Sequence, residues 1–178
     1  VDVALFKALE TDELFGLGMN EEYKDISFGL YASADLTAAD GSVIPAGGLL
    51  EVVSVSANEA GGYDACFDSD LPFGSYYVQE RTTNSAYVLS DTKYPVVFEY
   101  AGQEAALVQI LVNEGEAVSN DLLRGRVDGV KVGENPEGGE DVKLSGALMG
   151  LFRPDTEEFT EENALLTVTT AEDAALPL

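Results

Sequence analysis

The feature that most restricts the fold of this chain is a series of short apolar segments separated by clusters of turn-forming residues. Runs rich in Val, Leu, Ile, Tyr and Phe recur along the sequence: ISFGLYA, LLEVVSVSA, GSYYVQE, YPVVFEY and ALVQILV. Clusters such as AADGS and NEAGG lie between them. Short strands separated in this way by turn clusters are typical of an all-β fold, and they predict an antiparallel β-sandwich.

One pair of these runs predicts a β-hairpin. The segment 94–112 contains two apolar stretches on either side of Ala101, Gly102 and Gln103. Two strand-like runs joined by a few residues that include glycine are typical of a hairpin.

The strongly negative net charge of the chain disfavours partners that are themselves negatively charged. The chain has 33 acidic and nine basic residues among 178, for a formal net charge of −24. A surface this acidic repels phosphate backbones and anionic lipid head groups. We therefore expect no nucleic-acid partner. No apolar run reaches transmembrane length, so we also expect no membrane insertion within this chain. The start, VDVALFKALE, lacks a basic signal-like region, which predicts that the chain is the interior of a longer protein.

The absence of histidine and the single cysteine exclude much catalytic chemistry. A Ser-His-Asp triad, a Cys-His pair and a histidine-ligated metal all need histidine. Cys66 has no second cysteine with which to form an internal disulfide. The acidic segment 155–163 lacks the spacing of a dedicated calcium loop and predicts a solvated face. We expect no metal, no cofactor and no turnover of an external substrate.

Internal similarity predicts two copies of one module. The sequence SFGLYASAD at 27–35 is echoed by ALMGLFRPD at 147–155, and VVSVSANE at 52–59 is echoed by LLTVTTAE at 165–172. This repetition predicts a first β-sandwich module at 1–124 and a partial second module at 125–178. The second copy stops before a counterpart of GSYYVQE appears.

Three polar side chains fall on the apolar faces of their own predicted strands. They are Lys7 in VDVALFK, Glu80 in GSYYVQE and Asn120 in AVSNDLL. Strand residues two apart point to the same side, so each of the three shares a face with apolar neighbours. The alternatives are that Lys7 extends to water at its strand end and that Asn120 caps a turn. Asn113 is a competing acceptor, but it adjoins the turn at 114–115, and we favour Asn120.

Together these residue types support a self-crosslinking reaction. Burial disfavours the charged forms of both a lysine and a glutamate. A neutral Lys7 amine is a nucleophile that can attack the side-chain amide carbon of Asn120. A protonated Glu80 would hydrogen-bond the amide oxygen of Asn120, polarise the amide and carry protons to the departing ammonia. The product would be an intramolecular Lys–Asn isopeptide bond.

The motifs resemble the Cna B-type repeats of Gram-positive surface adhesins and pilins. The resemblance lies in the strand ending in Lys7, ISFGLYA with its following DG turn, the text LPFGSYYVQE from Leu71 to Glu80, and NDLLRGRVDGVK. It covers 1–124 well and 125–178 in part. It implies an Ig-related, prealbumin-like sandwich in which Lys7 is the nucleophile, Glu80 the catalytic carboxyl and Asn120 the electrophile. Lys131 matches Lys7 in the second copy, where its partners are missing.

The resemblance also implies a function and a location. We expect a structural or adhesive module of an extracellular, cell-wall-anchored protein of a Gram-positive bacterium. Its partners would be neighbouring modules of the same polypeptide and a host matrix protein or glycan. The alternative is a carbohydrate- or protein-binding β-sandwich without a crosslink, in which Lys7 and Glu80 form only a salt bridge.

Overall fold

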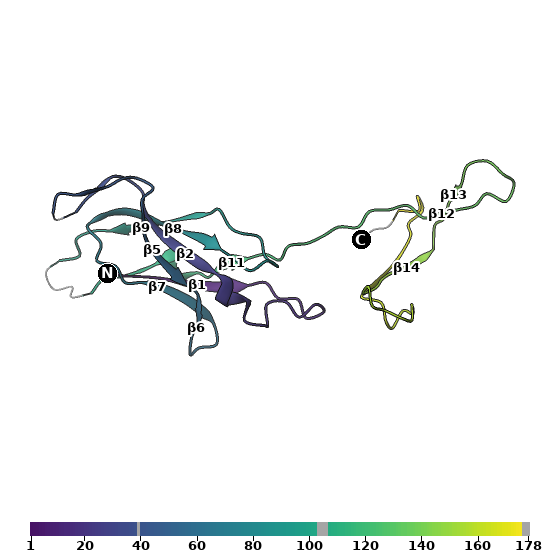
Figure 1. Cartoon of the computed structure of the whole chain (residues 1–178), viewed down its shortest axis with the longest axis horizontal. Helices are drawn as coiled ribbons and strands as arrows, with labels where there is room; N and C mark the ends of the chain where they lie inside the picture. The colour runs from purple at the N-terminus through teal and green to yellow at the C-terminus, as the bar shows by residue number, and fades with distance from the viewer. Residues whose placement is uncertain (39, 103–106, 176–178) are drawn as a thin grey trace. The chain divides into compact units, whose positions relative to one another are not determined.

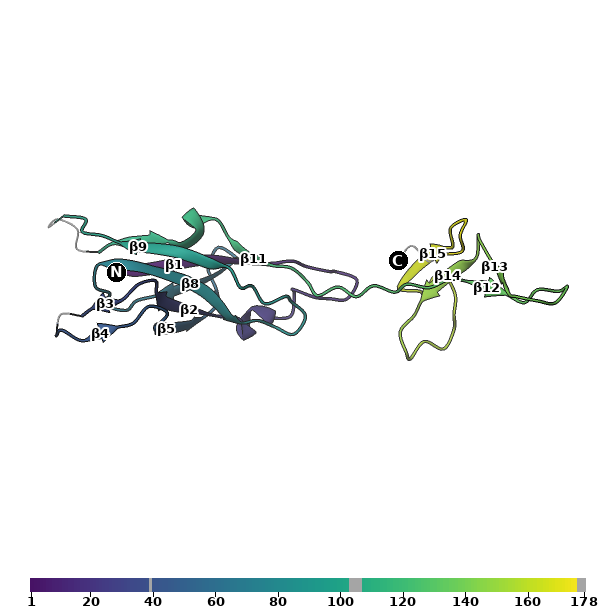
Figure 2. The same cartoon turned by 90° about the horizontal axis from the view of Figure 1, so that it is seen from above.

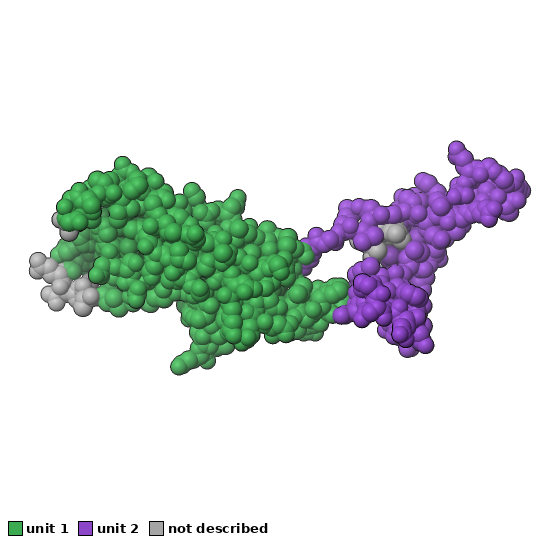
Figure 3. All heavy atoms as spheres, in the orientation of Figure 1, with its two compact units in different colours: residues 1–123 green, residues 124–178 purple. Residues whose placement is uncertain are grey.

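The computed structural model describes residues 1–38, 40–102 and 107–175. The chain divides into two compact units, Val1–Leu123 and Arg124–Leu178, which have different colours in Figure 3. Unit 1 contains Lys7, Glu80 and Asn120, the three residues that the sequence predicts to react.

The regular secondary structure of unit 1 is almost entirely β-strand. The first sheet contains β1 (Asp2–Leu9), β6 (Ser56–Ala57), β7 (Tyr63–Phe67), β10 (Gln109–Leu111) and β11 (Val118–Asn120). The second contains β2 (Ser27–Ala32), β5 (Leu49–Ser54), β8 (Gly74–Thr82) and β9 (Lys93–Phe98). A small ribbon is formed by β3 (Leu36–Thr37) and β4 (Val43–Ile44), and the short 3₁₀ segments are η1 (Glu22–Asp25) and η2 (Val112–Gly115). Among the described residues, no helix is long and apolar enough to cross a membrane.

The two sheets of unit 1 pack face to face, as the two views in Figures 1 and 2 show. The strand order is β10-β1-β7-β6 in the first sheet, where β11 also pairs with β1, and β5-β2-β8-β9 in the second. All pairs in the second sheet are antiparallel, whereas β1 is antiparallel to β7 and parallel to β10 and β11. The predicted all-β sandwich is confirmed.

The core lies between the sheets and follows the alternation of the strands. Residues two apart share a face, so one half of each strand's side chains points inward. In β2, Phe28 and Leu30 are fully buried, while Tyr31 lies half-buried on the outer face. There it stacks on Tyr77, its partner across the β2–β8 ladder. The inward side chains include Val3, Leu5, Phe67, Tyr76, Val78, Val96 and Val118.

The predicted hairpin in segment 94–112 is wrong. Its first strand, β9, pairs with β8 in the second sheet, whereas β10 pairs with β1 in the first sheet. The connection therefore crosses from one sheet to the other. Both strands are apolar, and alternation alone does not say which sheet a strand joins. Gln103, in the predicted turn, lies outside the described residues.

The described residues of unit 2 form two strand pairs and an isolated bridge between Val130 and Ala175. One pair is β12 (Val132–Gly133) with β13 (Val142–Lys143), and the other is β14 (Leu148–Leu151) with β15 (Leu166–Thr169). A Cβ placed on Gly150 would lie 2.5 Å from the Phe152 ring, as one placed on Gly29 would lie 2.7 Å from the Tyr31 ring. The same local packing thus occurs in both copies of the repeated text. Of the described residues of unit 2, only Thr170 and Ala174 are buried.

We expect the core to tolerate truncation poorly. Leu30→Ala removes a fully buried side chain from β2 and should lower the free energy of unfolding by about 2–5 kcal/mol, because it leaves a cavity. Leu49 on β5 is 46% exposed, and Leu49→Ala should change the same quantity by about 0.5 kcal/mol or less. Denaturant titration measures both. Equal losses would contradict the assignment of the inward face.

Candidate functional site

The structure brings Lys7, Glu80 and Asn120 together between the two sheets. Lys7 lies near the end of β1, Glu80 near the end of β8 and Asn120 at the end of β11. Each follows apolar residues on the inward face of its strand, and the three residues are only 4%, 5% and 2% exposed. The pairing of β1 with β11 places Lys7 opposite Val118, two residues before Asn120. Glu80 comes from the facing sheet.

The amine of Lys7 contacts a backbone carbonyl and lies near a carboxylate. Its Nζ donates to the backbone carbonyl of Val118 over 3.0 Å. Nζ lies 3.9 Å from Oε1 of Glu80, which is an ion-pair distance but too long for a hydrogen bond. The amine is therefore held beside the carboxyl without a direct hydrogen bond to it.

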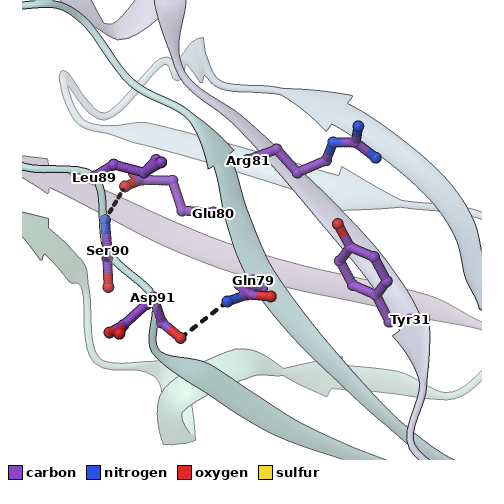
Figure 4. Close-up of a pocket in the computed structure, with 7 residues that line it drawn as sticks. All are labelled: Tyr31, Gln79, Glu80, Arg81, Leu89, Ser90 and Asp91. Atoms are coloured by element: carbon purple, nitrogen blue, oxygen red, sulfur yellow. Dashed lines mark hydrogen bonds between the residues drawn. The ribbon is translucent and has the colours of Figure 1, made fainter. Parts of the chain in front are cut away.

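The two carboxyl oxygens of Glu80 have different surroundings. Oε2 accepts hydrogen bonds from Nδ2 of Asn120 over 2.7 Å and from the backbone N–H of Ser90 over 2.9 Å. Figure 4 shows the carboxylate reaching Ser90 in the connection between β8 and β9. Oε1 is buried and has no hydrogen-bond partner among the described residues. Oε1 is thus the oxygen open to a proton, and it is the one that faces Lys7.

The amide of Asn120 is held in one orientation. Nδ2 donates to Oε2 of Glu80 and to the backbone carbonyl of Val88, each over 2.7 Å. Both amide hydrogens are therefore used. Oδ1 is buried and accepts no hydrogen bond from any described residue. The expected hydrogen bond from Glu80 to this oxygen is therefore not made, because the Glu80 carboxyl contacts Nδ2 instead.

Burial changes the acid–base chemistry of Lys7. Loss of solvent lowers the pKa of Lys7 from 10.5 to about 8, and the nearby Glu80 carboxylate opposes this shift. At neutral pH the neutral amine is therefore far more accessible than for a lysine in water. A nucleophilic amine, an amide carbon and a carboxyl that contacts or adjoins both are the components that amide exchange requires.

The other predicted site residues lie elsewhere. Asn113 is in η2 with left-handed backbone angles, is exposed, and donates to the carbonyl of Glu116. Lys131 is an exposed residue of unit 2. Within the described part of the chain, no group of three or more His, Cys, Asp or Glu residues is arranged to hold a metal ion.

Two contributors to the site were not predicted from the sequence. The carbonyl of Val88 and the N–H of Ser90 contact the Asn120 amide and the Glu80 carboxylate, respectively. Both are backbone groups, which every residue type except proline provides in full. No sequence signal could therefore have identified them.

Comparison with protein families places the fold in a known class, a prealbumin-like β-sandwich domain. The profile of the SpaA prealbumin-like fold domain matches residues 18–110, just over half of the chain. The chain belongs to this family. The matched range includes Glu80, whereas Lys7 and Asn120 lie outside it. No curated protein sequence matches the chain.

Several solved structures resemble this one in fold. The TIE protein of Bacillus anthracis has 14% identity and a TM-score of 0.46, over 98% of this chain and 25% of that protein. The SpaE basal pilin from Lactobacillus rhamnosus GG has 12% identity and a TM-score of 0.41, over 99% and 73%. BcpA, the major pilin subunit of Bacillus cereus, has 16% identity and a TM-score of 0.32, over 74% and 30%. The chain thus spans about a quarter of the TIE protein.

The pKa of Lys7 predicts a pH-dependent stability in a chain that does not crosslink. Below about pH 8 Lys7 is protonated in both states, and its buried charge destabilises the fold. Between about 8 and 10.5 the unfolded state binds more protons, so the free energy of unfolding rises with pH. In Asn120→Ala we expect a rise of up to about 1.4 kcal/mol per pH unit.

Denaturant titrations from about pH 8 to about pH 9.5 measure this slope, below the range in which tyrosines ionise. Lys7→Met in the Asn120→Ala background should remove the rise. Identical slopes with and without Lys7 would show that its amine is not in the desolvated site.

Proposed function

We propose that unit 1 is a structural module of a bacterial surface protein, in an adhesin or a pilin stalk, that locks itself with an isopeptide bond between Lys7 and Asn120. The observation that carries this proposal is the buried Glu80 carboxyl, with one oxygen toward Lys7 and the other bonded to the Asn120 amide. The SpaA prealbumin-like family accounts for the β-sandwich fold. The proposed crosslinking chemistry rests on the side chains of Lys7, Glu80 and Asn120. Glu80 would act once in each chain, so the module is not a turnover enzyme.

The reaction begins with a proton transfer inside the pair. Nζ of Lys7 gives a proton to Oε1 of Glu80, which leaves a neutral amine and a neutral carboxyl. The Nζ lone pair attacks Cγ of Asn120, and negative charge develops on Oδ1. A new C–N bond now joins β1 to β11.

The second stage releases the amide nitrogen. Glu80 takes up protons from Nζ on its Oε1 side and delivers protons to Nδ2 on its Oε2 side. The Cγ–Nδ2 bond breaks, Oδ1 returns to a carbonyl, and the nitrogen leaves as ammonium. Nζ has lost two protons and Nδ2 has gained two. Glu80 therefore ends as a carboxylate, and the number of protons is conserved.

The geometry favours this reaction over a purely structural salt bridge. A stabilising buried ion pair needs close contact and further hydrogen bonds to offset desolvation. Here Nζ and Oε1 are 3.9 Å apart, and Oε1 has no hydrogen-bond partner among the described residues. The pair is therefore poorly satisfied as it stands, which supports its being a reactant state.

The crosslink would suit a module that transmits force. By analogy with a disulfide, joining residues 7 and 120 would stabilise the fold by about 4–5 kcal/mol, and reducing agents would not break the bond. We propose that residues 125–178 belong to a second copy of the module, in which Lys131 takes the place of Lys7. Neighbouring modules, a host matrix protein or glycan, and a cell-wall-anchored location belong to the same proposal.

Removal of the acid–base group should prevent the bond. Glu80→Gln keeps the shape and hydrogen-bonding capacity of the side chain but cannot carry protons, so the chain should retain its full sequence mass. The wild type should be lighter by one ammonia. The variant should melt about 15–20 °C lower, because it lacks the crosslink.

Intact-mass spectrometry of the denatured chains measures whether each chain has lost one ammonia. The matched control is Glu51→Gln, which changes a half-buried carboxylate that accepts hydrogen bonds from Ser69. This control should lose ammonia as the wild type does. A crosslinked Glu80→Gln chain would refute the assigned role of Glu80.

The two candidate asparagines make opposite predictions. Asn120→Ala removes the buried amide, so that chain should keep its full mass. Asn113→Ala alters an exposed turn and should still lose one ammonia. Mass loss in Asn120→Ala, together with full mass in Asn113→Ala, would show that the acceptor is Asn113.

A further inference from the structure

We propose that Tyr87 is a positioning residue for the crosslinking reaction, because its hydroxyl fixes the connection that orients both the Glu80 carboxyl and the Asn120 amide. This inference rests on the proposed function. It adds a residue that touches neither reacting atom and that is not part of the Lys–Glu–Asn set.

Tyr87 anchors the connection between β8 and β9. Its side chain is buried, with 2% of the residue exposed, and its hydroxyl donates to the backbone carbonyl of Glu10 over 2.7 Å. Its backbone forms a β-bridge with Leu122, two residues beyond Asn120. Tyr87 therefore ties this connection to the chain that follows β1 through its side chain, and to the chain that follows β11 through its backbone.

The same connection carries the two backbone groups that touch the site. The carbonyl of Val88 accepts from the Asn120 amide, and the N–H of Ser90 donates to Glu80. These residues lie one and three positions after Tyr87. The N–H of Val88 also donates to the carbonyl of Asp121 over 2.9 Å. Any displacement of Tyr87 would therefore move both contacts.

Glu10, whose backbone carbonyl accepts the hydrogen bond of Tyr87, is itself held by two further hydrogen bonds. Its backbone N–H donates to the carbonyl of Asn120 over 3.2 Å, and its Oε2 accepts from the N–H of Leu122 over 2.8 Å. Glu10 follows β1, three residues after Lys7. The Tyr87 hydroxyl thus completes a set of contacts among the three segments that carry or orient the reacting groups.

A glycine covers this hydrogen bond. Gly18 has φ +79°, and a Cβ there would lie 2.8 Å from both the Glu10 carbonyl oxygen and the Tyr87 hydroxyl. The N–H of Gly18 donates to the carboxylate of Glu22 over 3.0 Å, which holds this loop in place. The Gly18 backbone therefore packs close to this hydrogen bond, at a place where any side chain would clash with it.

Orientation matters because the two ends of an amide are nearly the same shape but opposite in hydrogen bonding. With Nδ2 on the carbonyl of Val88, the leaving nitrogen faces Glu80. If the amide turned over, Oδ1 would face the Val88 carbonyl oxygen, and two acceptors would repel. The Val88 carbonyl therefore selects the orientation in which proton delivery to the leaving group is direct, and Tyr87 holds that carbonyl in place.

The test compares two tyrosines in the full chain. Tyr87→Phe removes only the hydroxyl. Tyr76→Phe is the matched control, because Tyr76 is also buried and its hydroxyl also donates to a backbone carbonyl, that of Pro72, near the start of β8. Cell-free synthesis followed by intact-mass spectrometry gives the rate at which folded chains lose ammonia. We expect about a tenfold decrease for Tyr87→Phe and less than about a twofold change for Tyr76→Phe.

A second measurement separates positioning from general stability. In the non-reacting Lys7→Met background, the Asn120 side-chain amide protons should exchange with solvent more rapidly in Tyr87→Phe than in Tyr76→Phe, as measured by NMR. An unchanged rate of ammonia loss in Tyr87→Phe, or equal decreases in both variants, would overturn the role of Tyr87. A wild-type chain that never loses ammonia would overturn the proposed function itself.

Discussion

The burial of one carboxyl between an amine and an amide is the constraint around which unit 1 is organised. Glu80, Lys7 and Asn120 are each at most 5% exposed, in a position where apolar residues would pack at lower cost. Oε1 of Glu80 and Oδ1 of Asn120 lack hydrogen-bond partners among the described residues. Unsatisfied buried groups are costly, so their presence at one point of the core requires a reason. The proposed reaction, which consumes the amine and the amide, would provide one.

The fold brings these groups together through the position of β1. This strand pairs with β7 on one side and with β10 and β11 on the other, so it is enclosed within its sheet. A bond from Lys7 to Asn120 would join β1 to the last strand of the unit. Because residues 7 and 120 lie near the two ends of unit 1 in sequence, such a bond would close a loop that includes nearly all of the unit.

Much of this arrangement follows from local sequence patterns. Period-two alternation placed Tyr76, Val78 and Glu80 on one face, and the structure has all three buried. Alternation did not reveal the sheet to which β10 belongs, because that depends on a connection between layers. Nor could the sequence reveal the contacts of Val88 and Ser90, since they are made by the backbone. Side-chain identity predicts the face of a strand, whereas the orientation of a reacting group depends on tertiary contacts.

The most direct test of the central claim is peptide mapping of the wild-type chain. After proteolysis, tandem mass spectrometry should identify one branched peptide that joins the Lys7 segment to the Asn120 segment and lacks one ammonia. Recovery of both segments as separate linear peptides, with Lys7 and Asn120 unmodified, would contradict the account.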